Sequence, residues 1–251
     1  MKILGSDYDG TLRYGGIDDK KREAISLWRK KGNKFGIVSG RGHHFLSEEP
    51  KKCEIECDFL VAYNGGMVLT PENEILFSVK CFDVEPISFV ETLFSYGCDF
   101  VHMNNKDYFK IRKYEKDLEK GDSTLGDYLL KDAPPIPFFY QVSVQLKDNE
   151  DAKRVVKLIE KDYGDKLTPL QNGICIDIVP KGVNKAFGLM KVAEIYGAAH
   201  DDIISVGDDV NDYAMIKEYR SYAMANGVDL IKSTATFITE SVTDLIYKEL
   251  E

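Results

Sequence analysis

Short apolar runs and amphipathic stretches follow one another along the first part of the chain. Residues 2–6, 35–38 and 59–62 are apolar runs, and each ends in a polar or glycine-rich turn, as buried strands do. Between the first two runs, residues 19–31 place apolar side chains at helical spacing. An order of strand, helix, strand is typical of a parallel α/β sheet.

The pattern changes after about residue 80. Residues 85–96 and 153–163 have helical spacing, whereas residues 140–146 and 174–179 alternate between apolar and polar positions. Strict alternation indicates strands with one face in water, which is common in antiparallel sheets. This middle part is therefore expected to form an antiparallel sheet with helices on one side.

The first pattern then returns, with a predicted helix over residues 184–196 and an apolar run over 203–206. We therefore predict a Rossmann-like parallel-sheet core formed by residues 1–80 and 181–251. Residues 81–180 are predicted to be a separate α+β domain inserted into it.

Composition and charge narrow the range of partners. The chain is 43% hydrophobic and 30% charged, with 42 acidic and 33 basic residues and a net charge of -9. That balance disfavours nucleic acid or an anionic membrane as a partner, since both are bound mainly through basic side chains. A small anionic substrate remains possible, because a bound metal can supply local positive charge. Oligomeric state is left open.

The chain is expected to act in the cytoplasm. Its N-terminal residues do not resemble a signal peptide. No apolar run approaches the roughly 18 residues that a membrane helix needs.

Candidate chemistry lies where three of the apolar runs end. In an open parallel sheet, ligands bind beyond the carboxyl ends of the strands. Carboxylates gathered there repel one another unless a cation lies among them, and all-oxygen ligands suit Mg²⁺. Arg41 and Asn64 lie beside the same edge and are candidates for ligand contact. The polar residues at the strand ends are Asp7 and Asp9, Ser39, and the group Asp208, Asp209, Asn211 and Asp212.

Four short motifs occur in a recognisable order. They are Asp-Tyr-Asp-Gly-Thr-Leu at residues 7–12, Val-Ser-Gly-Arg at 38–41, Lys185, and Gly-Asp-Asp-Val-Asn-Asp at 207–212. Together they resemble the motifs of the haloacid dehalogenase superfamily. Ala-Met-Ala-Asn-Gly at 223–227 is similar to a segment of the Cof-like hydrolase branch, whose α/β cap of type IIB would correspond to the insertion.

The resemblance implies a covalent mechanism. Asp7 would be the nucleophile and Asp9 the general acid and base. Mg²⁺ would be held by Asp7, Asp208 and the backbone carbonyl of Asp9. Ser39 and Lys185 would hold the phosphoryl oxygens.

Further residues of these motifs receive supporting roles from the resemblance. Asp212, together with Asp209, would position the lysine and the waters of the metal. Position 209 is Asp where the branch often has Asn or Gly, so the site carries an additional carboxylate. The candidates for phosphate or substrate binding are Ser39, Gly40, Arg41, Asn64, Lys185 and Asn211.

The resemblance predicts an Mg²⁺-dependent phosphatase acting on a small phosphorylated metabolite, most simply a sugar phosphate. A phosphotransferase or mutase on the same scaffold is the first alternative, with a sugar hydroxyl in place of water. A catalytically idle metabolite-binding protein is the second, although the complete set of motif residues argues against it. A carbon–halogen hydrolase fits less well, since it needs neither the acid at Asp9 nor magnesium.

Overall fold

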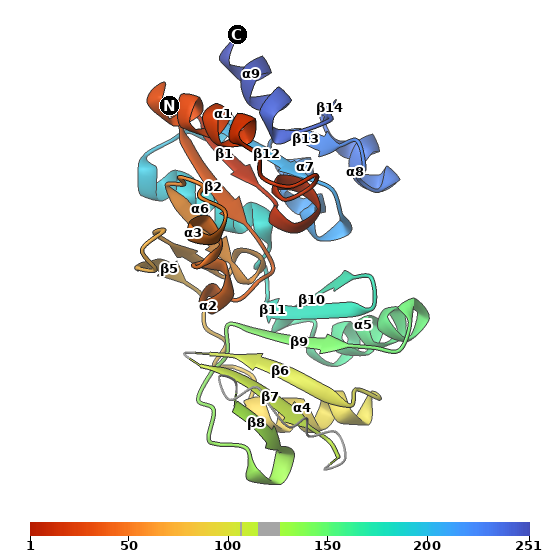
Figure 1. Ribbon diagram of the computed structural model, residues 1–251. Helices are drawn as coiled ribbons and strands as arrows, with labels where there is room; N and C mark the ends of the chain where they lie inside the picture. The colour runs from red at the N-terminus through yellow and green to blue at the C-terminus, as the bar shows by residue number, and fades with distance from the viewer. Residues whose placement is uncertain (106, 115–125) are drawn as a thin grey trace. The chain divides into compact units, whose positions relative to one another are not determined.

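The computed structural model describes residues 1–105, 107–114 and 126–251. These residues form two compact units (Figure 1). The core unit comprises Met1–Ser78 and Val183–Glu251, and the inserted unit comprises Val79–Gly182. Each unit has its own sheet. No helix in the described ranges is both long and apolar enough to span a membrane.

The core unit is built on an eight-stranded sheet. Six neighbouring strands, from β14 to β3, are parallel to one another. β4 then pairs antiparallel with β3, and β5 pairs antiparallel with β4. The middle strands are buried along their whole length, because helices cover both faces (Figure 1). In order across the sheet, the strands are β14 (Phe237–Thr239), β13 (Arg220–Met224), β12 (Ile203–Gly207), β1 (Ile3–Ser6), β2 (Lys34–Val38), β3 (Phe59–Ala62), β4 (Met67–Leu69) and β5 (Ile75–Ser78).

The helices of the core unit begin at residues that cap them. Asp18, Asn184 and Ser241 each accept a hydrogen bond from a backbone N–H in the first turn of the helix that follows. Helices α1 and α9 pack together, as do α6 and α7. The helices are α1 (Asp19–Lys30), α2 (His43–Leu46), α3 (Glu49–Lys52), α6 (Lys185–Tyr196), α7 (Tyr213–Glu218), α8 (Asp229–Thr234) and α9 (Val242–Leu250), with the short turns η1 (Tyr8–Leu12), η2 (Tyr63–Gly65), η5 (His200–Asp202) and η6 (Val210–Asp212).

The described residues of the inserted unit form a six-stranded sheet, and the helices α4 and α5 lie on one face of it (Figure 1). Among the strands that the described residues of this unit form, β7 and β8 are the only parallel neighbours. Apolar residues of α4 and α5 pack on the sheet in a single buried cluster that includes Phe89, Met103, Val155 and Ile178. The elements are α4 (Pro86–Ser95), α5 (Asn149–Tyr163), the short turn η4 (Leu130–Asp132) and, in sheet order, β10 (Leu167–Asn172), β11 (Cys175–Pro180), β9 (Gln141–Gln145), β6 (Phe100–Asn104), β7 (Tyr108–Arg112) and β8 (Gly126–Leu129).

The other face of this sheet is polar, and no helix of the described residues covers it, so we call it the helix-free face. His102, Ser143 and Asp177 lie in register across β6, β9 and β11. Ser143 donates a hydrogen bond to Asp177 (2.7 Å). Burial and the charge of nearby Lys110 lower the pKa of His102 to about 4, so its ring is neutral at pH 7. The alternation of residues 140–146 thus separates a packed face from a polar one.

Candidate active site

Two neighbouring parallel strands bring the first carboxylates together. Asp7 follows β1 and Asp208 follows β12, and these strands pair in register from Ile3 to Ser6. The backbone N–H of Asp7 donates to the carbonyl of Val206 (2.9 Å), which extends the pairing by one residue. Residues about 200 positions apart therefore meet at the carboxyl edge of the sheet.

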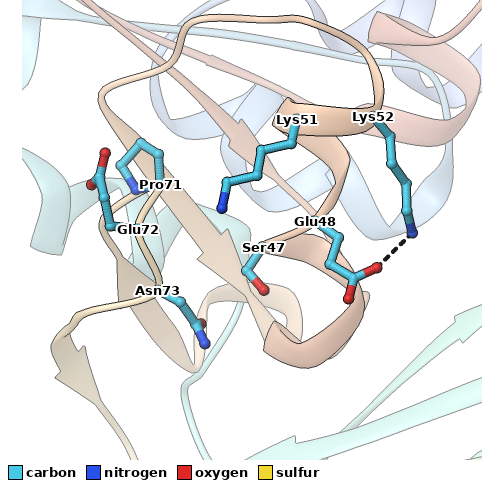
Figure 2. Close-up of a pocket in the computed structure, with 7 residues that line it drawn as sticks. All are labelled: Ser47, Glu48, Lys51, Lys52, Pro71, Glu72 and Asn73. Atoms are coloured by element: carbon cyan, nitrogen blue, oxygen red, sulfur yellow. Dashed lines mark ion pairs between the residues drawn. The ribbon is translucent and has the colours of Figure 1, made fainter.

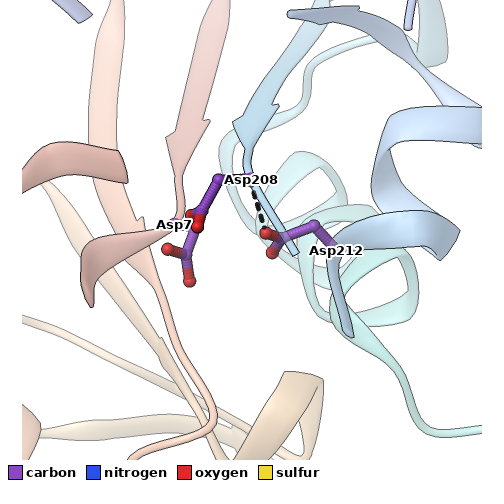
Figure 3. Close-up of side chains that lie close together, drawn as sticks. All are labelled: Asp7, Asp208 and Asp212. Atoms are coloured by element: carbon purple, nitrogen blue, oxygen red, sulfur yellow. Dashed lines mark hydrogen bonds between the residues drawn. The ribbon is translucent and has the colours of Figure 1, made fainter. Parts of the chain in front are cut away.

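Three carboxylates converge at this edge, which we call the carboxylate cluster. One oxygen each of Asp7, Asp208 and Asp212 lies within 4.8 Å of the others (Figure 3). Asp7 and Asp212 are buried, and Asp208 is partly buried. A group of hard oxygen donors at this spacing suits a divalent cation such as Mg²⁺.

Lys185 lies against the cluster at the first residue of α6. Its Nζ donates to Asp7 Oδ1 (2.7 Å) and to Asp212 Oδ1 (2.6 Å), and its side chain is completely buried. Close packing brings the helix to this position. A side chain on Gly65 would collide with the carbonyl oxygen of Asn184 at 1.9 Å, and Gly65 has a positive φ of +104° that favours glycine.

Burial and neighbouring charges shift the pKa values of the groups in the cluster. Burial opposes the positive charge of Lys185, but Asp212 and Asp7 outweigh it and raise the pKa of Lys185 above its ordinary value. Burial, with a smaller contribution from Asp7, raises the pKa of Asp208 to about 6. Burial also raises the pKa of Asp212, against the attraction of Lys185. A divalent cation would stabilise the ionised carboxylates, so these shifts fit a site that is completed by one.

Hydrogen bonds fix the side chains of the last motif. The second oxygen of Asp212 accepts from the backbone N–H groups of Asp208 (2.9 Å) and Asp209 (3.1 Å), the first of which is drawn in Figure 3. Thr11 donates its hydroxyl to Asp208 Oδ1 (2.6 Å). A Cβ on Gly10 would lie 1.9 Å from Asp208 Oδ2, so only glycine leaves room for this carboxylate.

The side chain of Asp209 caps a helical turn and is not part of the carboxylate cluster. Its carboxylate accepts a hydrogen bond from the N–H of Val210 (2.7 Å) at the start of η6. Asp209 thus caps the turn that carries Asp212. The side chain of Asn211 is partly buried and makes no hydrogen bond to the residues that the structure describes.

Ser39, Gly40 and Asn64 belong to a second group beside the cluster. Ser39 is buried at the end of β2, and its carbonyl accepts from the N–H of Asn64 (3.0 Å). Its hydroxyl oxygen accepts from the N–H of Arg41 (3.2 Å), which closes a tight turn around Gly40. Tyr63 and Asn64 have positive φ angles of 54° and 52°, a strained arrangement that is frequent at functional sites.

The Asp9 side chain is outside the carboxylate cluster and half exposed. It forms a two-pronged ion pair with Arg41, with Nε to Oδ2 at 2.8 Å and Nη2 to Oδ1 at 2.6 Å. The structure therefore pairs two residues that the sequence assigned to separate roles.

Comparison with known proteins decides the family. The sequence model of the haloacid dehalogenase-like hydrolases matches residues 4–246, nearly the whole chain. The chain belongs to this family. Its family membership, its α/β fold class and its enzyme class, a phosphatase of the haloacid dehalogenase-like hydrolases, were predicted from the motifs and are confirmed.

Individual relatives align over most of their length. The chain is 27% identical to the stress response protein YhaX of Bacillus subtilis (strain 168), over 96% of this chain and 88% of that protein. It is 25% identical to the 5-amino-6-(5-phospho-D-ribitylamino)uracil phosphatase YcsE of the same organism, over 96% and 90%. A crystal structure from Streptococcus mutans UA159 shares the fold, with a TM-score of 0.82, 22% identity and coverage of 100% and 99%.

In this haloacid dehalogenase-like hydrolase, a further hollow of about 490 Å³ lies on the core unit beside α3 and the turn between β4 and β5 (Figure 2). Its wall includes Ser47, Lys51 and Asn73, and Lys52 forms an ion pair with Glu48 (2.7 Å) at its edge. None of the lining residues is a site residue predicted from the sequence. The hollow therefore contains none of the side chains for which the sequence predicts chemistry.

Three residues of the haloacid dehalogenase-like site, Thr11, Tyr8 and Glu49, were not among the site residues predicted from the sequence. Thr11 lies within the first motif, where its hydroxyl could have been recognised as a partner for a carboxylate. Tyr8 and Glu49 both contact Arg41 and each other. Glu49 gives no such signal, because it stands in a charged segment that resembles a solvated surface helix.

Proposed function

We propose that this phosphatase hydrolyses the phosphate ester of a small metabolite through an aspartyl phosphate on Asp7. One observation carries the proposal: the buried ammonium of Lys185 lies between the carboxylates of Asp7 and Asp212, with Asp208 beside them. Such an arrangement holds an ionised carboxylate ready to attack and supplies positive charge for a phosphoryl group.

The proposed reaction has two steps. An oxygen of Asp7 attacks phosphorus as the bond to the ester oxygen breaks, and the carboxyl of Asp9 gives its proton to that oxygen. Asp9 then takes a proton from water, whose oxygen attacks phosphorus and releases phosphate from Asp7. The protons balance, because Asp9 ends each cycle as it began.

Positive and polar groups would hold the phosphoryl oxygens. We assign Lys185 and the hydroxyl of Ser39 to this task, since both are buried and next to the nucleophile's strand. Gly40, Asn64 and Asn211 remain predicted contacts of the phosphate or substrate. Asp212 would position Lys185, while Asp209 would act through the turn that it caps.

Mg²⁺ suits the carboxylate cluster, since its donors are all oxygens and lie within 4.8 Å of one another. Asp7, Asp208 and the backbone carbonyl of Asp9 would hold the ion. Both oxygens of Asp212 already accept hydrogen bonds, so we leave it outside this set. When bound, the ion would offset the negative charge between the Asp7 carboxylate and the substrate phosphate.

We expect phosphate release from 4-nitrophenyl phosphate to require Mg²⁺ and to stop in excess chelator. In Asp208→Asn the Mg²⁺ concentration for half-maximal activity should rise at least about 10-fold, as when a metal site loses a supporting contact. Asp244→Asn, a matched change at an exposed residue that pairs with Ser241, should leave that concentration unchanged. Full activity in chelator would contradict a metal-dependent mechanism.

The inserted unit is proposed to act as the cap that selects the substrate. Its helix-free face carries hydrogen-bonding side chains suited to hydroxyl groups, among them His102, Ser143 and Tyr108. The related phosphatase from Bacillus subtilis is named for a substrate with a phosphorylated ribityl chain. We therefore propose a phosphorylated sugar or sugar alcohol as the substrate. The cytoplasmic location of the protein stays a separate prediction.

A panel of phosphorylated sugars, sugar alcohols, nucleotides and coenzymes tests this substrate class. We expect the highest kcat/KM for a member of the first two groups, with free phosphate as the product. Phosphate appearing on an added sugar would favour a phosphotransferase or mutase. Binding without turnover across the panel would favour a metabolite-binding protein.

A further inference from the structure

Arg41 uses every nitrogen of its guanidinium group. Nε and Nη2 hold the two oxygens of Asp9, and Nη1 lies 3.5 Å from Glu49 Oε1. The guanidinium carbon also lies 5.1 Å from the centre of the Tyr8 ring. Planar Arg–carboxylate pairs of this kind fix orientation as well as distance.

The groups that hold Arg41 are themselves fixed. Glu49 is buried, and it accepts a hydrogen bond from the hydroxyl of Tyr8. Tyr8 is completely buried and stands in the sequence between Asp7 and Asp9. Its buried ring therefore limits the movement of Arg41. The position of the Asp9 carboxylate is set by Arg41, which is held in turn by these two buried side chains.

We propose that Arg41 is a positioning residue, which holds the Asp9 carboxyl group in the orientation needed for proton transfer to the leaving oxygen. Glu49 and Tyr8 hold Arg41 in turn. The proposal rests on the proposed function of Asp9. The ion pair occupies one lone pair on each oxygen of Asp9, so further sites remain for the transferred proton. Fixed orientation matters because proton transfer requires a short, aligned contact with the substrate.

Two roles of Arg41 can be separated by the leaving group of the substrate. A phosphate-binding arginine, as predicted from the sequence, would affect all esters alike. A residue that positions the general acid would affect esters of alcohols, which need a proton to leave, far more than esters of 4-nitrophenol. The parameter to compare is kcat/KM, since it covers the steps up to transfer of the phosphoryl group to Asp7.

The test compares Arg41→Gln and Arg41→Lys with Arg13→Gln. Arg13 is a matched control, since it lies 3.9 Å from Asp9 and 5.8 Å from the centre of the Tyr8 ring but forms no two-pronged pair. In Arg41→Gln we expect kcat/KM to fall about 100-fold for the best alkyl phosphate of the panel and less than about 3-fold for 4-nitrophenyl phosphate. Arg41→Lys should show a smaller loss with the same preference, because lysine keeps the charge without the fork.

Arg13→Gln should stay within about 2-fold of the wild type for both esters. Glu49→Gln should reproduce the Arg41 pattern more weakly, and thermal unfolding of each variant reports on folding. Equal losses for both esters in folded Arg41 variants would overturn the proposal and favour phosphate binding. Failure of the proposed function looks different, because the wild type itself would then hydrolyse neither ester.

Discussion

Asp7→Asn is expected to abolish phosphate release from 4-nitrophenyl phosphate. An amide cannot form the aspartyl phosphate, and loss of a covalent nucleophile removes at least about 10⁴-fold of the rate in comparable enzymes. The substitution keeps the size of the side chain, and the N–H that pairs with Val206 is unaffected. Steady-state phosphate release and mass spectrometry of the acid-quenched protein would measure the loss of turnover and of the phospho-enzyme.

Asp18→Asn is the matched control for this substitution. Asp18 caps α1 through a hydrogen bond from the N–H of Lys21 (2.9 Å), and asparagine caps helices about as well as aspartate. Its turnover should equal that of the wild type. Substantial activity in Asp7→Asn would contradict the covalent mechanism and would indicate direct attack by water.

Lys185→Met is expected to damage both stability and activity. The ammonium is fully buried between two carboxylates. Removal of one partner from a buried ion pair typically lowers the free energy of unfolding by about 3–5 kcal/mol. The loss of its positive charge from the phosphoryl site should lower kcat at least about 100-fold. Urea unfolding and turnover measure the two effects.

A second substitution separates charge from packing. In Lys185→Met combined with Asp212→Asn, one of the two buried carboxylates is gone, so part of the lost stability should return while activity stays low. Lys191→Met is the control on the same helix, because Lys191 pairs with Glu194 near the surface (2.9 Å) and should change unfolding by less than about 1 kcal/mol. If the double variant is no more stable than Lys185→Met, repulsion between the carboxylates is not the cause.

The fold could be predicted where burial is complete or alternation is strict. The apolar runs that became β1, β2, β3 and β12 contain at most one polar residue each, so they stand out in the sequence. Edge strands were missed for a physical reason. In β5 the exposed residues include Ile75 and Leu76, and β10 contains Pro169, which only an edge strand tolerates.

The site could likewise be predicted where its residues follow buried strands, and not where they depend on contacts between loops. Asp7 and Asp208 follow strands whose ends can be located in the sequence, so their approach could be predicted from sheet topology. The pairing of Arg41 with Asp9 could not, because it depends on side-chain directions in two loops 32 positions apart. Glu49 illustrates the limit most clearly, since its burial beside Tyr8 is decided by packing and not by its neighbours in the sequence.

The insertion also determines when the enzyme can become complete during synthesis. The central strand β1 has β2 on one side and β12 on the other, and β12 begins only at Ile203. A nascent chain that has passed the inserted unit still exposes one edge of β1, which is an open template for incorrect pairing. The ribosome must therefore synthesise the chain beyond residue 203 before this edge can be covered. The same late strand brings Asp208, so no product of translation that stops before residue 208 can contain the assembled carboxylates.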